Sequence, residues 1–487
     1  MLSELTDATT TIVCDFLVPQ DVAALRKLKA FRAAAPSRWK VAVSCKSHLQ
    51  VESEALQVAE KWAQDWSEEC RSVWQPQFRW LASCAPLQSL TIADTSPRVW
   101  AVVHCVEKLE ESEEKKIRIP EDIADVLSIL AEVQQSGLCL GSFLDELDVG
   151  QYPCLTEVGL AALSVCSNLR KLTLRVDGHL VNHDICADLR FLKRLEDLTL
   201  FVWHHSDEEK VVTHDGLCIL ATLPLRRLEI EQGFFDNDPL LPFSNCATLE
   251  HVHFGEIDAE LSDEGLLAVV RGCNLRSLEL CFGHCGWAGA WDWPRGMRSG
   301  LTESGFRSLG EAELERLEIM GPPPELPPLD LLGEVLGANL THLRLDHCDD
   351  HLTEQGLQRI LSRCPRVETL YIYDLFIKDV QILLNCQAIR ELDVACFCDH
   401  DVAAVATGLP RLEILSLADP DITDASLRHL ASATARFNRF RRLSIRGQQG
   451  DVQFSAAARA TNFGFIIDME DYDRSNLDAR PVESVES

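Results

Sequence analysis

The sequence lacks the signals of secreted, membrane-spanning and nucleotide-dependent proteins. Residues 1–7 are acidic and polar, without the basic segment of a signal peptide. No apolar run approaches the length of ~20 residues that a membrane span needs. No Walker loop, Gly-x-Gly-x-x-Gly, Gly-x-Ser-x-Gly or His-Glu-x-x-His motif occurs. We therefore expect an intracellular protein, cytoplasmic or nuclear, that is not an enzyme, needs no cofactor and has no membrane partner.

Basic residues are scarce: 46 Lys and Arg stand against 76 Asp and Glu, and the net charge is −30. The excess of acidic residues lies wholly in residues 101–487. This charge disfavours nucleic acid as a partner, because nucleic-acid binding depends on a basic surface. A basic protein partner fits the charge, although solubility alone would also account for it.

The 19 cysteines are too few for a disulfide scaffold in a chain of 487 residues, and their number is odd. We interpret them as small buried thiols in a reducing compartment. Two clusters contain soft metal ligands: Cys281, His284 and Cys285, and Cys396, Cys398 and His400. Each would hold zinc only if a fourth ligand converged, and neither has Cys-x-x-Cys spacing. We therefore predict no metal site.

A repeated unit is clearest at residues 340–364. Leu340, Leu343 and Leu345 follow a Leu-x-x-Leu-x-Leu pattern, which a short strand satisfies when its apolar side chains point one way. The second half of the unit has helical apolar spacing, and Thr353 precedes it as an N-cap. One strand and one helix cannot bury their own apolar faces, so the unit requires neighbouring copies.

Twelve copies of the strand triplet are present, most of them 22 to 30 residues apart. They begin at Leu144, Leu169, Leu195, Leu225, Leu249, Leu275, Leu314, Leu340, Val367, Ile389, Leu412 and Phe440. The helical half often opens on Leu-Ser/Thr-x-x-Gly-Leu, as at residues 261–266 and 352–357. We predict an α/β leucine-rich-repeat solenoid, a horseshoe with parallel strands on its concave face and helices outside.

Cysteines recur at fixed places in this unit. Those just before a triplet are Cys166, Cys246, Cys273, Cys364 and Cys386, and Cys348 follows one. Over roughly residues 140–446 the unit resembles the cysteine-containing subtype of leucine-rich repeat. That subtype is found mostly as the substrate-binding part of F-box/leucine-rich-repeat proteins, so the resemblance implies a protein-binding array.

Residues 1–45 have the apolar spacing of a small all-α module. They resemble a degenerate F-box at Leu5, Ile12, Phe16, Leu17, Pro19, Asp21, Val22, Leu25 and Leu28. Thr6 stands where the motif has proline, and no Val-Cys pair follows Leu28. The resemblance implies that these apolar residues, Leu5 to Leu28, dock a Skp-type adaptor linked to a cullin scaffold. The alternative is a helical cap for the solenoid.

The chain divides into four parts by pattern. Residues 1–45 form the F-box-like module, and residues 46–137 a helical linker or cap with a first repeat strand at Leu87, Leu90 and Ile92. Residues 138–446 are the solenoid. Residues 447–487 hold a closing strand, expected at 463–467, and an acidic tail.

An insertion at residues 282–300 interrupts the array and contains Trp287, Trp291 and Trp293. Long loops in regular arrays often carry function, and exposed tryptophans concentrate binding energy. These three side chains either anchor a partner or fold back onto a repeat, and the sequence favours neither. A third hypothesis, an enzyme, would place its active site in this insertion.

The strand register also predicts a binding surface, because residues between the triplet positions face the concave side. The predicted partner-binding residues are Glu229, Glu231, His253, Glu279, Glu318, Arg344, Tyr371, Tyr373 and Asp393. We expect a basic protein to lie across residues 229–318; a solvated acidic face is the alternative. The predicted function is protein–protein recognition. By resemblance, it is that of a substrate receptor in a Skp–cullin–F-box ubiquitin ligase; the alternative is a scaffold or regulator without a ligase link.

Overall fold

The computed structural model describes residues 11–16, 40–45, 75, 79 and 89–94, and residues 144–471 apart from short gaps. It consists of two compact units, Met1–Asp236 and Asn237–Ser487.

The first unit contains parallel strands, each paired with the next along the chain. They are β1 (Thr11–Phe16), β2 (Lys40–Cys45), β3 (Ser89–Asp94), β4 (Glu146–Gln151), β5 (Lys171–Asp177), β6 (Asp197–Trp203) and β7 (Arg227–Glu231). The helical elements described in full are η4 (Leu163–Val165) and α7 (His214–Leu220). Strand β3 confirms the early repeat strand predicted around Leu90.

The helix predicted around Ile12 and Phe16 is wrong, because these residues lie in β1 and pair with β2. Helical spacing over so short a segment does not distinguish a helix from a strand. Three consecutive β-branched residues, Thr11, Ile12 and Val13, favour a strand, and β2 supplies a parallel neighbour with Val41 and Val43. Part of the expected all-α module is therefore β-structure.

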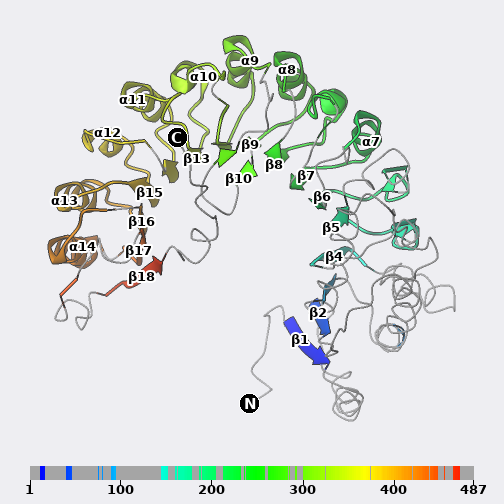
Figure 1. Cartoon of the computed structure of the whole chain (residues 1–487), viewed down its shortest axis with the longest axis horizontal. Coiled ribbons are helices and arrows are strands. Elements are labelled where there is room, and N and C mark those ends of the chain that lie inside the picture. Colours follow the sequence, from blue (N-terminus) through cyan, green and yellow to red (C-terminus); the bar gives the residue numbers. More distant parts are fainter. Residues whose placement is uncertain are drawn as a thin grey trace, which may run out of the picture. The chain divides into compact units, whose positions relative to one another are not determined.

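The second unit repeats strand and helix more regularly (Figure 1). Its strands are β8 (His251–Ile257), β9 (Ser277–Phe282), β12 (Arg316–Met320), β13 (His342–Asp346), β14 (Thr369–Ile372), β15 (Glu391–Ala395), β16 (Ile414–Ala418), β17 (Arg442–Gly447) and β18 (Ile466–Asp471). Its helices are α8 (Asp263–Gly272), α9 (Glu303–Ser308), α10 (Leu332–Val335), α11 (Glu354–Arg363), α12 (Gln381–Leu384), α13 (Asp399–Gly408) and α14 (Asp424–Phe437), with short turns η6 (Leu241–Asn245), η7 (Leu309–Glu311) and η8 (Leu329–Leu331).

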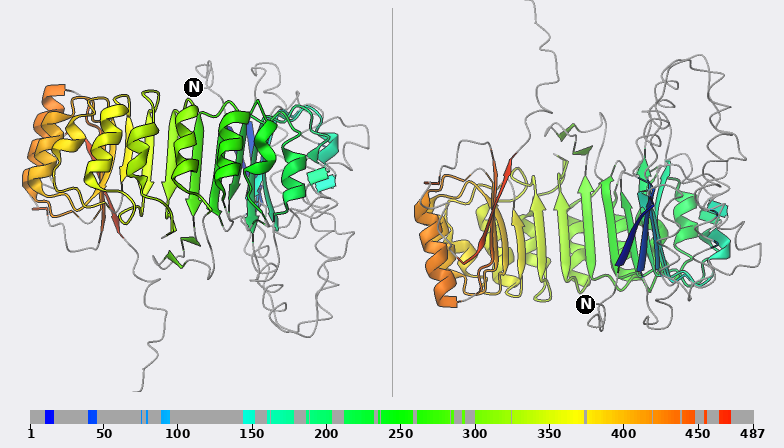
Figure 2. Two further views of the ribbon diagram at one scale, coloured as in Figure 1. Left: turned by 90° about the horizontal axis from the view of Figure 1, so that it is seen from above. Right: turned by 90° about the horizontal axis from the view of Figure 1, so that it is seen from below.

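Within this unit the strands pair in parallel in chain order, except that β9 pairs directly with β12. The insertion between them contains a separate antiparallel pair, β10 (His284–Cys285) and β11 (Trp291–Asp292). Figure 2 shows that the helices of this unit cover one face of its strands. The predicted closing strand forms as β18, three residues later than expected.

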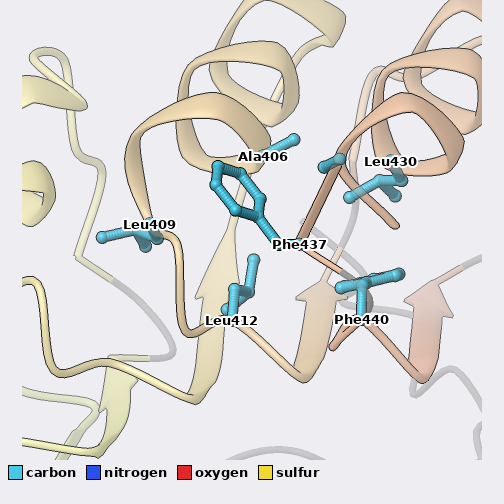
Figure 3. Close-up of a pocket in the computed structure, with 7 residues that line it drawn as sticks. Ala406, Leu409, Leu412, Leu430, Phe437 and Phe440 are labelled. Atoms are coloured by element: carbon cyan, nitrogen blue, oxygen red, sulfur yellow. The ribbon is translucent and has the colours of Figure 1, made fainter. Parts of the chain in front are cut away.

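The predicted triplets form the core. Every triplet residue in the twelve copies is buried, with at most 5% of its surface exposed. Figure 3 shows this packing near the end of the second unit, where Leu412 and Phe440 point toward the helices and Phe437 lies between α13 and α14. The fold is an α/β leucine-rich-repeat solenoid, as the repeated Leu-x-x-Leu-x-Leu pattern predicts.

Several neighbouring repeats of the second unit are joined by what we call the aspartate–hydroxyl ladder. An aspartate of one repeat accepts hydrogen bonds from the backbone N–H and the hydroxyl of the next helix's N-cap residue. For Asp330 and Thr353, the N–Oδ1 and Oγ1–Oδ2 distances are 2.8 and 2.7 Å. Other rungs join Asp238 to Ser262, Asp263 to Thr302, and Asp399 to Thr423. At the C-terminal end, Asp424 accepts from the N–H of Ser455 at 2.9 Å.

This ladder explains the glycine of the helical motif. Thr353 is the N-cap of α11, and its Oγ1 accepts from the N–H of Gly356 at 3.0 Å. A Cβ on Gly356 would lie 2.0 Å from the Oδ1 of Asp330, so the carboxylate occupies the space of a side chain. Gly265 and Gly305 stand in the same relation to Asp238 and Asp263. The N-cap predicted at Thr353 is confirmed.

The repeat cysteines are structural where the structure describes them. Cys348 donates to the carbonyl of Asp346 at 3.2 Å, and Cys386 donates to the carbonyl of Val367 at 3.4 Å. Burial raises the pKa of Cys166 to about 12, so this thiol stays protonated at neutral pH. Among the described residues, no helix is long and apolar enough to cross a membrane.

Candidate functional site

The helices leave one face of the second unit's strands open (Figure 2, right), and these strands contain the predicted residues His253, Glu279, Glu318, Arg344, Tyr371 and Asp393. Successive side chains of a strand alternate between faces, so the residues between buried triplet positions lie on this open face. The residues that form contacts there are His253, Glu279, Arg316, Glu318, His342, Arg344, Asp346, Tyr371, Glu391, Asp393 and Arg446. We call this set the strand-face network.

Glu279 of β9 lies between cationic groups on both neighbouring strands. His253 Nδ1 lies 2.8 Å from its Oε2, and Arg316 Nε lies 2.6 Å from its Oε1. Ser277 also donates to Oε1, at 3.1 Å. Burial would raise the pKa of Glu279, but the His253 hydrogen bond and the Arg316 charge outweigh it and lower the pKa to about 2. The carboxylate is therefore held ionised.

Glu318, on the adjacent β12, is the most deeply buried acid of the network, with 4% of its side chain exposed. His342 Nε2 lies 2.7 Å from its Oε1, and the Arg316 guanidinium pairs with the same oxygen. Arg344 Nη1 lies 3.9 Å from Oε2. A buried carboxylate needs such compensation, because an unpaired buried charge is strongly destabilising.

Arg344 links these acids to an aromatic residue. Its Nε donates to Asp346 Oδ2 at 2.6 Å, and its guanidinium carbon lies 5.8 Å from the ring centroid of Tyr371. The Tyr371 hydroxyl donates to Glu391 Oε2 at 3.1 Å. Burial and the charge of Glu391 raise the pKa of Tyr371 to about 12. The phenol therefore remains a neutral hydrogen-bond donor.

Asp393 pairs with an arginine two strands away. It lies on β15 and Arg446 lies on β17, yet the guanidinium binds both carboxylate oxygens. Between them, at the register position of Arg446 on β16, stands the small residue Ala418. Burial raises the pKa of Asp393 to about 6, with Arg446 acting in the opposite direction.

The glutamates of the network are more deeply buried than its arginines. Glu279 and Glu318 have 12% and 4% of their side chains exposed, whereas Arg316 and Arg344 have 42% and 40%. The sequence predicted an acidic face from the same glutamates. The structure pairs both of them within the chain, so they are less available to a basic partner than the sequence indicates.

Two predicted residues lie in the first unit. Glu229 on β7 pairs with Arg227 and accepts from the Thr199 hydroxyl at 2.8 Å. Glu231 is the last residue of β7, two positions further along the same face. The hypothesis of a basic partner lying across residues 229–318 stays a prediction.

The other predicted residues lie in the insertion, in the F-box-like segment 5–28 and at Tyr373. Trp291 lies in β11, opposite Cys285, and Ile12 and Phe16 lie in β1. Outside the described residues are Leu5, Leu17, Pro19, Val22, Leu25, Leu28, Trp287, Trp293 and Tyr373. Adaptor binding and the role of the insertion therefore remain predictions.

Sequence reasoning missed Arg316, His342, Glu391 and Arg446. The first three could have been found, because each lies two positions from a predicted residue and hence on the same face. Arg446 has that spacing from Ser444, but its partner Asp393 is two strands away. Only the register of β15, β16 and β17 in the structure identifies the pair of Asp393 and Arg446.

Among the described residues, no three His, Cys, Asp or Glu side chains are grouped to hold a metal ion. Cys398 belongs to the capping of α13, and its Sγ donates to Asp401 Oδ2 at 3.0 Å. The Asp401 carboxylate also accepts from the N–H of Cys398, as in a capping box.

Comparison with known proteins finds only low similarity to solved structures. No family model matches the chain, and no curated protein matches it. Among solved structures, it is similar to an internalin (InlF) from Listeria monocytogenes, with 12% identity, a TM-score of 0.38, and coverage of 75% of this chain and 94% of the internalin. It is also similar to TLR13 in a complex with ssRNA13, with 14% identity, a TM-score of 0.38, and coverage of 76% and 60%. A Bacteroides fragilis protein has 13% identity, a TM-score of 0.29, and coverage of 58% and 66%.

Proposed function

We propose that the chain is a protein-recognition module that binds its partner on the strand-face network of the second unit. The observation that carries this proposal is the cluster of Arg316, Arg344 and Tyr371 on the open face of the strands, each held by contacts within the chain. Arginine and tyrosine are enriched at the centres of protein interfaces and often dominate their binding energy.

The contacts of this cluster also favour binding. Arg316 is held by Glu279 and Glu318, and Arg344 is held by Asp346 and the ring of Tyr371. Side chains that are already fixed lose little conformational freedom when a partner docks. Each arginine side chain is nevertheless about two-fifths exposed, so a partner can reach it.

The test compares Arg344→Ala and Tyr371→Ala with Arg428→Ala, an exposed control on α14 at the helical side. Proteins cross-linked to each form of the full chain in cells are quantified by mass spectrometry. We expect a set of proteins lost from both strand-face variants and retained by the control. Identical sets from all three variants would refute the strand face as the binding surface.

We also propose, more specifically, that the chain acts as the substrate receptor of a Skp–cullin–F-box ubiquitin ligase. This rests on the resemblance of residues 5–28 to an F-box. The mechanism would be effective concentration, since a bound target's lysines are kept near the conjugating enzyme. The alternative, a scaffold or regulator without a ligase link, is favoured by β1, which joins the parallel strands where the motif has a helix.

Co-purification of the full chain with a purified Skp-type adaptor decides between them. Adaptor binding that is lost in Phe16→Asp and Leu25→Asp, while Arg344→Ala still binds, would support the ligase proposal. If the intact chain never captures the adaptor, the scaffold alternative is supported. Strand-face recognition is common to both and is tested separately by the cross-linking experiment.

A further inference from the structure

The C-terminal end of the second unit contains a hollow of about 510 Å³, remote in sequence from most of the strand-face network. It lies where the segment after α14 meets the start of β18. Arg439, Phe440 and Arg441 line it from the first segment, and Phe465 and Ile466 line it from the second. We call it the arginine hollow.

Part of the lining is apolar. Phe440 and Phe465 pack edge to face, with ring centroids 4.9 Å apart. Ile466 has 57% of its surface exposed, and among the exposed large hydrophobic residues in the described part of the chain only Phe376, at 58%, is more exposed. An apolar side chain placed against these residues would remove both surfaces from water.

The cationic part of the lining contrasts with the charge of the chain. Residues 436–446 include five arginines and no acidic residue, in a protein of net charge −30. Two of the five arginines form ion pairs outside the hollow: Arg442 with Asp468 at 3.0 Å, and Arg446 with Asp393. A third, Arg436, lies in the last turn of α14, where the helix dipole favours a cation.

The two arginines of the hollow are less compensated. Arg439 is exposed and forms no ion pair within the described residues. Arg441 has 76% of its side chain exposed, and its one described partner, Glu413 at 3.5 Å, is shared with Arg390 at 3.1 Å. The hollow therefore offers guanidinium donors beside an apolar surface.

We propose that the arginine hollow binds an acidic peptide segment of a partner protein, one in which Asp or Glu is adjacent to an aliphatic or aromatic residue. The carboxylate pairs with Arg439 and Arg441, and the apolar side chain packs on Phe465 and Ile466. Nucleic acid fits less well, because its phosphates would pair only with the arginines and leave the apolar lining of Phe465 and Ile466 unused. This second surface goes beyond the strand-face recognition proposed above.

The experiment measures fluorescence polarisation of a labelled Glu-Leu-Glu-Phe-Glu peptide with the full chain at low salt. We expect saturable binding that Arg439→Glu weakens about tenfold or more and that Ile466→Ser weakens about threefold. The matched control is Arg411→Glu. Arg411 occupies in the preceding repeat the position that Arg439 occupies in its own, directly before the first triplet residue (Leu412 and Phe440, respectively). This control should bind like the unaltered chain, and a Gln-Leu-Gln-Phe-Gln peptide should not bind.

Three outcomes would overturn the proposal. The first is that the acidic peptide does not bind. The second is that Arg411→Glu weakens binding as much as Arg439→Glu, which would show a general charge effect. The third is that a single-stranded oligothymidylate binds more tightly than the peptide, which would assign the hollow to nucleic acid. Arg439 and Arg411 are both exposed, so matching thermal unfolding of the two variants is the folding control. Arg344→Ala, on the strand face, should leave peptide binding unchanged.

Discussion

The helical and strand sides of the second unit both use carboxylates to join successive repeats, but in different ways. On the helical side, Asp238, Asp263, Asp330 and Asp399 each bind the N-cap residue of the next helix. On the strand side the pairing differs from repeat to repeat: Glu279 and Glu318 share Arg316 but each adds a histidine from a different neighbouring strand, whereas Asp393 pairs with Arg446 two strands away. Repeated contacts hold an array together, whereas contacts that differ from repeat to repeat can distinguish one partner from another.

The largest loss of stability is expected at Gly356, where a side chain would clash with Asp330. Gly356→Ala would bring a Cβ to 2.0 Å from Asp330 Oδ1, and we expect a loss of about 3 kcal/mol in the free energy of unfolding. Urea denaturation of the full chain measures it. The control is Gly337→Ala, because no atom lies within 4 Å of a Cβ there. Equal losses in the two variants would contradict the steric account.

A sharper form of this test comes from the repeat in which serine replaces glycine. Ser426 stands at the glycine position, and its N–H and hydroxyl both donate to Asp399 Oδ1. Gly356→Ser should therefore be less destabilising than Gly356→Ala, although serine is larger. Serine as harmful as alanine would show that Asp330 cannot adjust as Asp399 does.

Removal of the Asp330 carboxylate should lower the free energy of unfolding by less, about 2 kcal/mol. Asp330→Ala leaves the N–H of Thr353 without its acceptor and also removes the Arg359 ion pair. It opens the space that a Cβ on Gly356 would fill, so the double variant Asp330→Ala/Gly356→Ala should cost less than the sum of the single changes. Additive free energies of unfolding would disprove the coupling.

On the strand side, Glu279 should make stability depend on pH. Its pKa is lowered from 4.5 to about 2 in the folded chain, so the unfolded chain binds the proton more readily. The stabilisation is therefore complete above pH 4.5 and is lost as pH falls toward 2. After allowance for solvent screening it is on the order of 1 to 2 kcal/mol. The difference in unfolding free energy between wild type and Glu279→Gln should shrink over this range; a constant difference would contradict the assignment.

The smallest effect is expected at the edge of the strands. Arg276 and Glu315 are paired at 2.5 Å, but 47% and 50% of their side chains are exposed. Exposed pairs contribute little, so Glu315→Gln should change the free energy of unfolding by about 0.5 kcal/mol or less, and less still in high salt. A loss comparable to that of Asp330→Ala would mean that exposure is a poor guide on this face.

The sequence predicted the helical side better than the strand side, for a physical reason. Leu343, Thr353 and Gly356 belong to a motif, and a motif reports a local requirement that every repeat shares. The pairing of Glu318 with His342 is between two strands, so it depends on register and on side-chain direction. The negative charge of Glu318 can be predicted from its residue type, whereas its burial depends on the neighbouring strands.

The error at β1 has the same origin. Ile12 and Phe16 are spaced as on a helix, but a short apolar segment also fits a strand, and a parallel neighbour decides between them. That neighbour, β2, is more than twenty residues away in sequence. The Asp393–Arg446 pair is a further case, because it crosses an intervening strand whose only sequence signal is the small residue Ala418.

The bond from the Ser455 N–H to Asp424 has a practical consequence for the limits of the domain. The segment after β17 supplies to α14 what a following repeat supplies to the earlier helices, and Phe454 beside it is buried. Expression of the array therefore has to extend through β18. A protein cut after residue 447 would leave the last helix without its neighbour, and proteolysis should then begin at α14.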